Sequence, residues 1–118
     1  MKQGFVKVAS ATPRIRVADP VYNAQVICEQ AKEAAEHGAK IVVFPELCIT
    51  GYTCNDLFLQ ELLLEKAKEA LLTIAEETGQ LETLFLVGLP VDKDGRLYNV
   101  AAVLYRGRIL GMIPKKNI

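Results

Sequence analysis

A single carboxylate directly follows a strongly apolar segment in the stretch FPELCITGYTCND, which runs from Phe44 to Asp56. The apolar run 41–44 stops at Pro45, and Glu46 comes next. Ligands of parallel α/β sheets bind beyond the carboxyl ends of the strands, and a proline fixes φ on the approach. Burial of Glu46 among its apolar neighbours would raise its pKa and make it a better general base near neutral pH. The alternative, which position alone favours, is a loop carboxylate that caps a backbone N–H.

A lysine near the end of the chain is the second candidate for chemistry. Lys115 follows Pro114 directly after an apolar segment. Beside a basic carboxylate, its ammonium group could stabilise an oxyanion or a charged intermediate. The alternative is that Lys115 and Lys116 form a solvated pair at a strand end, and the residues alone favour that alternative.

The three cysteines and the single histidine offer little to a nucleophilic mechanism. Cys28 falls on the apolar side of an expected helix, where we expect a core residue. Cys48 is close to Glu46 in sequence, but in an extended segment its side chain would point elsewhere. Cys54 has no histidine motif nearby, and His37 falls in a last helical turn, where a cation is favoured. We therefore expect none of these side chains to be catalytic, and no glycine-rich phosphate loop is present.

Composition restricts the classes of function. The chain has 118 residues, with 14 Lys plus Arg and 14 Asp plus Glu, so its net charge of zero gives no support for binding nucleic acid or an anionic membrane. The apolar runs are too short to span a bilayer. The three cysteines are an odd number and lack the spacing of zinc or haem sites, so we expect no metal site. With no secretory signal at the amino terminus, these thiols predict a reduced, cytoplasmic protein.

The pattern of apolar residues predicts an α/β fold with a mixed sheet. The expected elements are strands at 5–11, 40–44, 83–91, 97–105 and 109–113, and helices at 20–37 and 57–78. Asp19 and Gly38 are placed to cap and to end the first helix. The segments DKDGR and RGR predict tight turns between the last three strands, which would form an antiparallel meander after a parallel βαβαβ start.

Two helices are too few to cover both faces of a five-stranded sheet. We expect both helices on one face, with the strand at 40–44 fully buried. The other face must then be covered by something outside this sequence, because so large an apolar patch is rarely left exposed in a stable monomer.

Several motifs together resemble a known family. FPELCITGY resembles the glutamate motif of the nitrilase, or carbon–nitrogen hydrolase, superfamily. The motifs VASATP, VADPVYN, GYTCNDLF, LVGLPV and LYNVAAVLYRGRILGMIPK occur in the order found in the glutaminase domains of glutamine-dependent NAD synthetases. The resemblance covers nearly the whole chain, and the collinear order makes it more specific than any single motif.

The resemblance implies a fold and a set of catalytic residues. The fold would be the first half of an αββα sandwich that carries a Glu–Lys–Cys triad. Glu46 would be the general base, and Lys115 the lysine, preferred over Lys116 because the family places it directly after this proline. Tyr52 would line the glutamine pocket. The nucleophilic cysteine would lie beyond Ile118, since none of the three cysteines matches it.

The resemblance also implies a longer parent enzyme. Residues 1–118 would be the N-terminal part of a glutaminase domain, truncated before the nucleophile and inactive alone. The parent would hydrolyse glutamine and use the ammonia for ATP-dependent amidation of deamido-NAD to NAD, as a homo-oligomer. ATP and Mg would belong to a synthetase domain absent here, with no cofactor in this chain. The alternatives are part of a stand-alone amidase or carbamoylase of the same superfamily, or a non-catalytic α/β half-domain.

Overall fold

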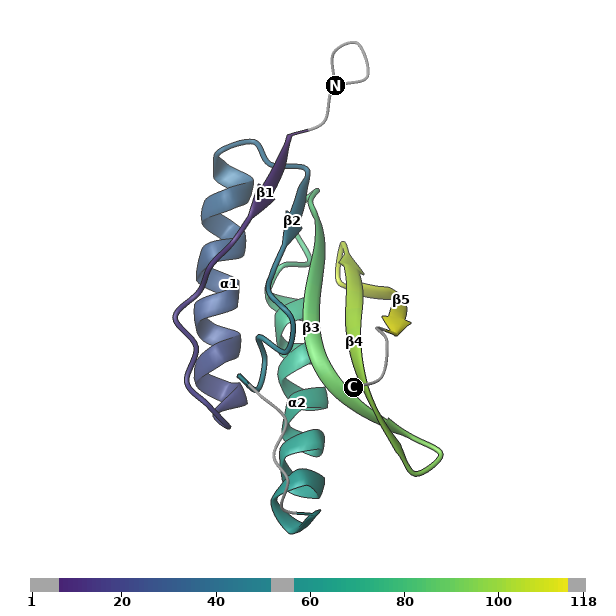
Figure 1. The fold of residues 1–118 in the computed structure, drawn as a ribbon. Helices are drawn as coiled ribbons and strands as arrows, with labels where there is room; N and C mark the ends of the chain where they lie inside the picture. Colours follow the sequence, from purple (N-terminus) through teal and green to yellow (C-terminus); the bar gives the residue numbers. More distant parts are fainter. Residues whose placement is uncertain (1–6, 52–56, 115–118) are drawn as a thin grey trace.

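The computed structural model describes residues 7–51 and 57–114, which form one mixed sheet and two helices (Figure 1). The elements are β1 (Val8–Ser10), α1 (Pro20–Glu36), β2 (Ile41–Val43), α2 (Leu57–Glu77), β3 (Leu84–Lys93), β4 (Arg96–Tyr105) and β5 (Arg108–Pro114). The strands lie in the order β1-β2-β3-β4-β5. The first three are parallel, and β3, β4 and β5 pair antiparallel, which confirms the predicted mixed sheet.

Helix α1 begins at Pro20, as predicted, and ends at Glu36, one residue before the predicted end. The side chain of Asp19 accepts a hydrogen bond from the backbone N–H of Tyr22 at 3.2 Å, and Pro20 occupies the first turn, where a missing N–H costs nothing. At the other end, Gly38 has a φ of +88°, the left-handed conformation that ends many helices. The caps therefore fix the position of α1 along the chain.

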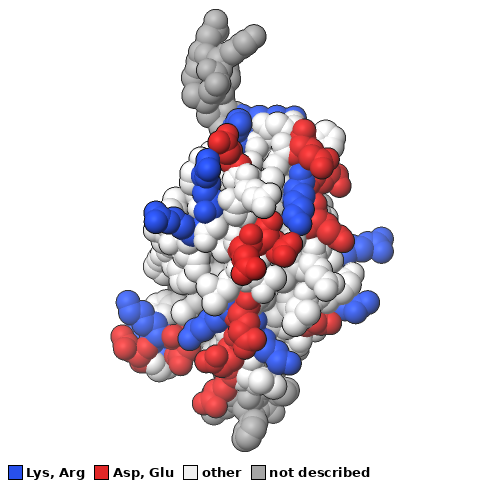
Figure 2. All heavy atoms as spheres, turned by 180° about the vertical axis from the view of Figure 1, so that it is seen from behind, with Lys and Arg blue, Asp and Glu red and all other residues white. Residues whose placement is uncertain are grey.

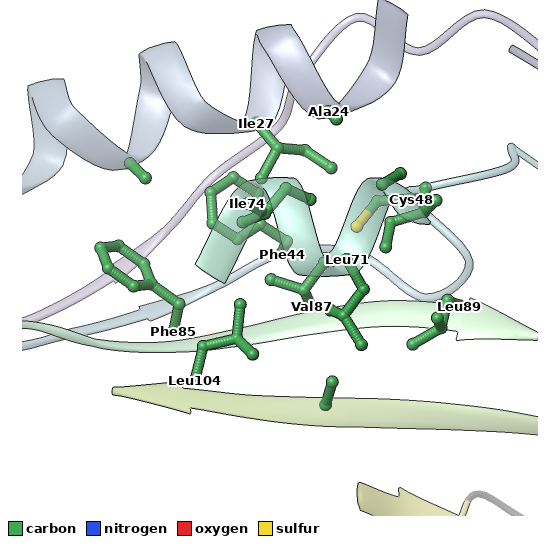
Figure 3. Packing of buried hydrophobic residues seen from close by; sticks show 14 of the residues in the cluster. Ala24, Ile27, Phe44, Cys48, Leu71, Ile74, Phe85, Val87, Leu89 and Leu104 are labelled. Atoms are coloured by element: carbon green, nitrogen blue, oxygen red, sulfur yellow. The ribbon is translucent and has the colours of Figure 1, made fainter. Parts of the chain in front are cut away.

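The hydrophobic core lies between the sheet and the helix layer (Figure 3). Ile27 of α1 and Ile74 of α2 are fully buried in one cluster with Phe85 and Val87 of β3. On the outside, Lys32 of one helix and Glu77 of the other form an ion pair at 3.2 Å. Figure 2 shows acidic and basic side chains intermixed over the molecule seen from behind, as expected of a surface in water.

The second face of the sheet carries apolar side chains that no described element covers. Neighbouring strands place Val43 beside Leu86 and Leu86 beside Val103, on the face opposite the helices. Val43 is 37% exposed, whereas Val42, which faces the core, is 0% exposed. The expectation that this strand is fully buried is therefore wrong. Both helices lie on one face, as predicted, so only alternate residues of β2 are buried.

Two tight turns build the antiparallel meander. Asp94 and Gly95 have φ values of +54° and +78°, and Arg106 and Gly107 have values of +51° and +83°. Two consecutive left-handed residues form the hairpin turn that matches strand twist, as the sequence indicated. The pairing of β4 with β5 is irregular near Val103, so the ladder between these strands contains a bulge.

Candidate active site

Glu46 lies just beyond the carboxyl end of β2, as predicted, but its side chain is exposed. Its neighbours Phe44 and Ile49 are buried in the core, and Figure 3 shows Phe44 among Ile27 and Ile74. The expected burial of Glu46 is therefore wrong, because the apolar side chains around it in sequence point to the other side of the backbone.

The segment 44–51, which we call the Glu46 loop, is bonded to β3 on both sides of the carboxylate. The N–H of Phe44 donates to the carbonyl of Leu86 at 2.9 Å, and the N–H of Ile49 donates to the carbonyl of Gly88 at 3.1 Å. Two anchors only five residues apart in the loop leave Glu46 little freedom of position.

Gly88 allows the Glu46 loop to lie directly against the strand. A Cβ atom on Gly88 would lie 2.5 Å from the backbone nitrogen of Leu47 and 2.8 Å from the carbonyl oxygen of Pro45. Both atoms belong to the backbone, so relief of the contact would require the loop itself to shift. The absence of a side chain at this position therefore sets how closely Glu46 approaches the sheet.

A carboxamide from the next strand contacts the carboxylate. Nδ2 of Asn99, on β4, donates to Oε2 of Glu46 at 3.2 Å. The Oδ1 atom of Asn99 is buried and accepts no hydrogen bond from the described residues. Asn99 was not among the residues predicted for the site. The signal that could have found it is an amide within the apolar strand LYNVAAVLY, on the face opposite Val100. A polar group buried in a sheet needs a hydrogen-bond partner, so such an amide indicates a polar neighbour.

Glu46 and Asn99 share a pocket of about 210 Å³. Its other walls include Val43, Leu86 and Ile113, and among the described residues that line it, Glu46 and Asn99 are the two with polar side chains. A small ligand with a polar end fits such a pocket, because apolar walls exclude water and a few polar groups fix orientation. The carboxylate could move a proton there.

Of the other predicted site residues, Lys115 and Tyr52 lie outside the described part of the chain. The backbone up to Pro114 is described, and Pro114 pairs with Val100, next to Asn99 in β4. Since β5 is antiparallel to β4, and β4 to β3, the strands β2, β3 and β5 run in the same direction. The carboxyl ends of β2 and β5 therefore lie at the same edge of the sheet.

Neither described cysteine is suited to be a nucleophile. Burial raises the pKa of the Cys48 thiol from about 9 to about 11, and its Sγ donates to the carbonyl of Gly88 at 3.7 Å. The pKa of the Cys28 thiol is also raised from about 9 to about 11, mainly by burial and to a lesser degree by the charge of Glu77. A thiol with so high a pKa is protonated at neutral pH and reacts slowly.

The other titratable groups in the described part of the chain form no metal site. Within residues 7–51 and 57–114, no three His, Cys, Asp or Glu side chains are placed to hold a metal ion. Nδ1 of His37 lies 2.8 Å from the carbonyl oxygen of Glu33, at the end of α1, as expected of a structural residue. In the same described part, no helix is long and apolar enough to cross a membrane.

The fold and the matched sequence define the class of protein. The chain belongs to the carbon–nitrogen hydrolase family, whose sequence pattern matches residues 7–118. It is similar to the glutamine-dependent NAD(+) synthetases of Mycobacterium tuberculosis (39% identity over 117 residues) and Acinetobacter baylyi (33% over 118 residues). These matches cover 99–100% of this chain but only 17–21% of the length of the relatives.

Solved structures agree with this assignment. A glutamine-dependent NAD(+) synthetase from Cytophaga hutchinsonii superposes with a TM-score of 0.85 and 30% identity, over 96% of this chain and 19% of that one. An amidase from Nesterenkonia sp. superposes with a TM-score of 0.79 over 100% of this chain and 45% of that one. Its 23% identity supports the shared fold alone. The predicted family and fold class are thus confirmed.

Proposed function

We propose that the complete protein carrying this chain is a glutamine-dependent NAD(+) synthetase, and that residues 1–118 are the N-terminal part of its glutaminase domain. The observation that carries the proposal is the position of Glu46. Its carboxylate lies at the carboxyl end of β2, beside a small pocket and at the sheet edge where β5 also ends. Relatives with this name match nearly the whole chain, which supports the choice of reaction.

In this proposal, Glu46 accepts the proton of a cysteine thiol that lies beyond Ile118. The thiolate attacks the side-chain amide of glutamine, and the ammonium group of Lys115 stabilises the oxyanion of the tetrahedral intermediate. Glu46 returns the proton to the leaving nitrogen, and ammonia departs from a thioester. Glu46 then takes a proton from water, whose oxygen attacks the thioester carbonyl. The C–S bond breaks, glutamate is released, and Glu46 returns the proton to the thiolate. Tyr52 lines the pocket that holds the glutamine.

The rest of the proposed enzyme lies outside this chain. The released ammonia would amidate deamido-NAD to NAD in a synthetase domain, where ATP and Mg would bind. Such an enzyme would work in the cytoplasm as a homo-oligomer. The chain of 118 residues alone would not hydrolyse glutamine, because the proposal places the nucleophile beyond it.

The test separates the two half-reactions in the complete protein. We expect Glu46→Gln and Lys115→Ala to lower NAD formation from glutamine by about 10²–10⁴-fold, the usual contribution of a general base or an oxyanion donor. NAD formation from added ammonia should stay at the wild-type rate, because the second site is intact. Equal rates from glutamine in the wild type and in Glu46→Gln would refute the proposal.

A matched control comes from the opposite edge of the sheet. Glu82 precedes β3 at its amino end and forms an exposed ion pair with Arg106 at 3.0 Å. Glu82→Gln makes the same chemical change as Glu46→Gln. It should leave both activities unchanged, because it is remote from the pocket.

A further inference from the structure

Asn23, on α1, is a polar side chain that is hydrogen-bonded through both its amide oxygen and its amide nitrogen. It is 0% exposed. Its Oδ1 accepts from the N–H of Arg16 at 2.7 Å, and its Nδ2 donates to the carbonyl oxygens of Arg16 and Ile49, both at 2.7 Å. One carboxamide thus joins three chain segments: the connection before α1, α1 itself and the Glu46 loop.

Ile49 is where this carboxamide meets the candidate site. The N–H of Ile49 donates to Gly88 of β3, and its carbonyl accepts from Asn23. Both backbone groups of one residue, three positions after Glu46, are therefore bonded in opposite directions, one to the sheet and one to the helix layer. Ile49 therefore fixes the position of the Glu46 loop between the sheet and the helix layer.

The connection before α1 supports the same end of the loop. The N–H of Ala18 donates to the carbonyl of Thr50 at 2.7 Å. Gly51 has a φ of +87°, and a Cβ atom there would lie 3.0 Å from the Cα of Val17. The backbone of this connection is thus in close contact with residues 50 and 51. Asn23 holds the same connection through the backbone N–H and carbonyl of Arg16.

We propose that Asn23 is a positioning residue for the general base. It holds the Glu46 loop at the position between the sheet and the helix layer that places the carboxylate beside the pocket. That Glu46 is the base rests on the proposed function, whereas the contacts of Asn23 with the loop do not, so only the activity arm of the test depends on the reaction. Asparagine suits this position because one short planar group supplies two donors and one acceptor. Aspartate has the same shape but would direct a charged acceptor at two carbonyl oxygens.

The test compares Asn23→Asp with Gln25→Glu in the complete protein. Gln25 is an exposed residue of the same helix, so Gln25→Glu makes the same amide-to-carboxylate change away from the loop. Hydrogen exchange is followed at the amides of residues 49–51 and, for comparison, at those of Phe85 and Val87 in β3. Glutamine hydrolysis and ammonia-dependent NAD formation are measured on the same samples.

We expect Asn23→Asp to accelerate exchange at residues 49–51 at least tenfold, to leave Phe85 and Val87 unchanged, and to lower kcat for glutamine hydrolysis at least tenfold. Ammonia-dependent synthesis should be kept, and Gln25→Glu should match the wild type throughout. Unchanged exchange in the loop would overturn the proposal. So would a general rise that includes β3, since Asn23 would then support the fold as a whole.

Other outcomes separate this proposal from the proposed function. Faster exchange in the loop with an unchanged kcat would show that Asn23 does not position the base. If the wild-type protein does not hydrolyse glutamine, the proposed function fails, while the exchange data still decide whether Asn23 holds the loop. If circular dichroism shows that Asn23→Asp is unfolded, Asn23→Ser takes its place, because it removes Nδ2 without adding charge. Loss of the fold in both variants would also overturn the proposal.

Discussion

Asn99 and Glu46 are 53 residues apart in the sequence and meet at one edge of the sheet, where Nδ2 of Asn99 donates to Oε2 of Glu46 at 3.2 Å. The contact joins β4 to the loop after β2. This hydrogen bond favours one orientation of the carboxylate, which suits the proposed general base because such a group must meet its proton in line.

Removal of this donor should impair catalysis more than stability. We expect Asn99→Leu, which keeps the approximate size of the side chain, to lower kcat for glutamine hydrolysis in the complete protein by about ten- to a hundredfold, because small displacements of a catalytic group are costly. The control is Tyr98→Phe, one residue earlier on the core side of β4, which should keep the wild-type kcat. A wild-type kcat for Asn99→Leu in a steady-state glutaminase assay would contradict this prediction.

Gly88 and Gly111 provide a matched pair for testing the close approach of the Glu46 loop to β3. A Cβ at Gly88 would collide with the backbone of Leu47 and Pro45, whereas a Cβ at Gly111 would meet nothing within 4 Å. We expect Gly88→Ala to lower the free energy of unfolding by about 1–3 kcal/mol, the usual cost of overpacking, and Gly111→Ala to change it by less than about 0.5 kcal/mol. Urea unfolding of both variants measures the difference. Equal stability of the two would show that the loop can move away freely.

The parts of the fold that local chemistry controls could be predicted from the sequence. Asp19 and Gly38 marked the ends of α1, and the pairs Asp94–Gly95 and Arg106–Gly107 marked the turns of the meander. In each case, the signal and the structure it specifies lie within a few residues of each other. The residue Glu46 could also be singled out, because a proline and an acid after an apolar strand are a local pattern.

The features that hold Glu46 in place could not be predicted in this way. Asn23 bonds to a residue 26 positions away, and Asn99 to one 53 positions away, so neither contact leaves a local pattern. Gly88 looks like any glycine in a strand until the loop that lies against it is known. The exposure of Glu46 was wrongly predicted, because hydropathy averages over neighbours and does not say to which side of the backbone each side chain turns.

The uncovered face of the sheet should make the isolated chain of 118 residues self-associate. Val43 and Ile113 are 37% and 52% exposed on this face, where Leu86 and Val103 are only partly buried. We expect sedimentation velocity to show association that grows with concentration, and Ile113→Lys to reduce it, because a charge opposes burial of the face. Leu72→Lys, an exposed apolar position on α2, is the control and should have less effect. A monomeric wild-type chain at all concentrations would contradict this prediction.

Cys48 should resist alkylation in the folded protein. Burial raises its pKa from about 9 to about 11, so at pH 8 its thiolate fraction is about a hundredfold lower than that of an ordinary cysteine. We expect the reaction of Cys48 with iodoacetamide, followed by mass spectrometry of its peptide, to be slower by at least that factor in the folded protein than in urea. Similar rates in the two conditions would mean that the thiol is accessible and readily ionised.

The same shift makes stability depend on pH in the alkaline range. The folded pKa of Cys48, about 11, lies above the ordinary value of about 9, so between these values the folded state keeps a proton that the unfolded state has lost. The stabilisation is therefore fully present below about pH 9 and is lost as the pH rises through about 11. We expect the free energy of unfolding to fall over this range. The fall should be less steep in Cys48→Ala, with each protein compared with itself at pH 8 so that the cost of the cavity cancels. Identical slopes for the two proteins in urea unfolding series would show that this thiol does not contribute.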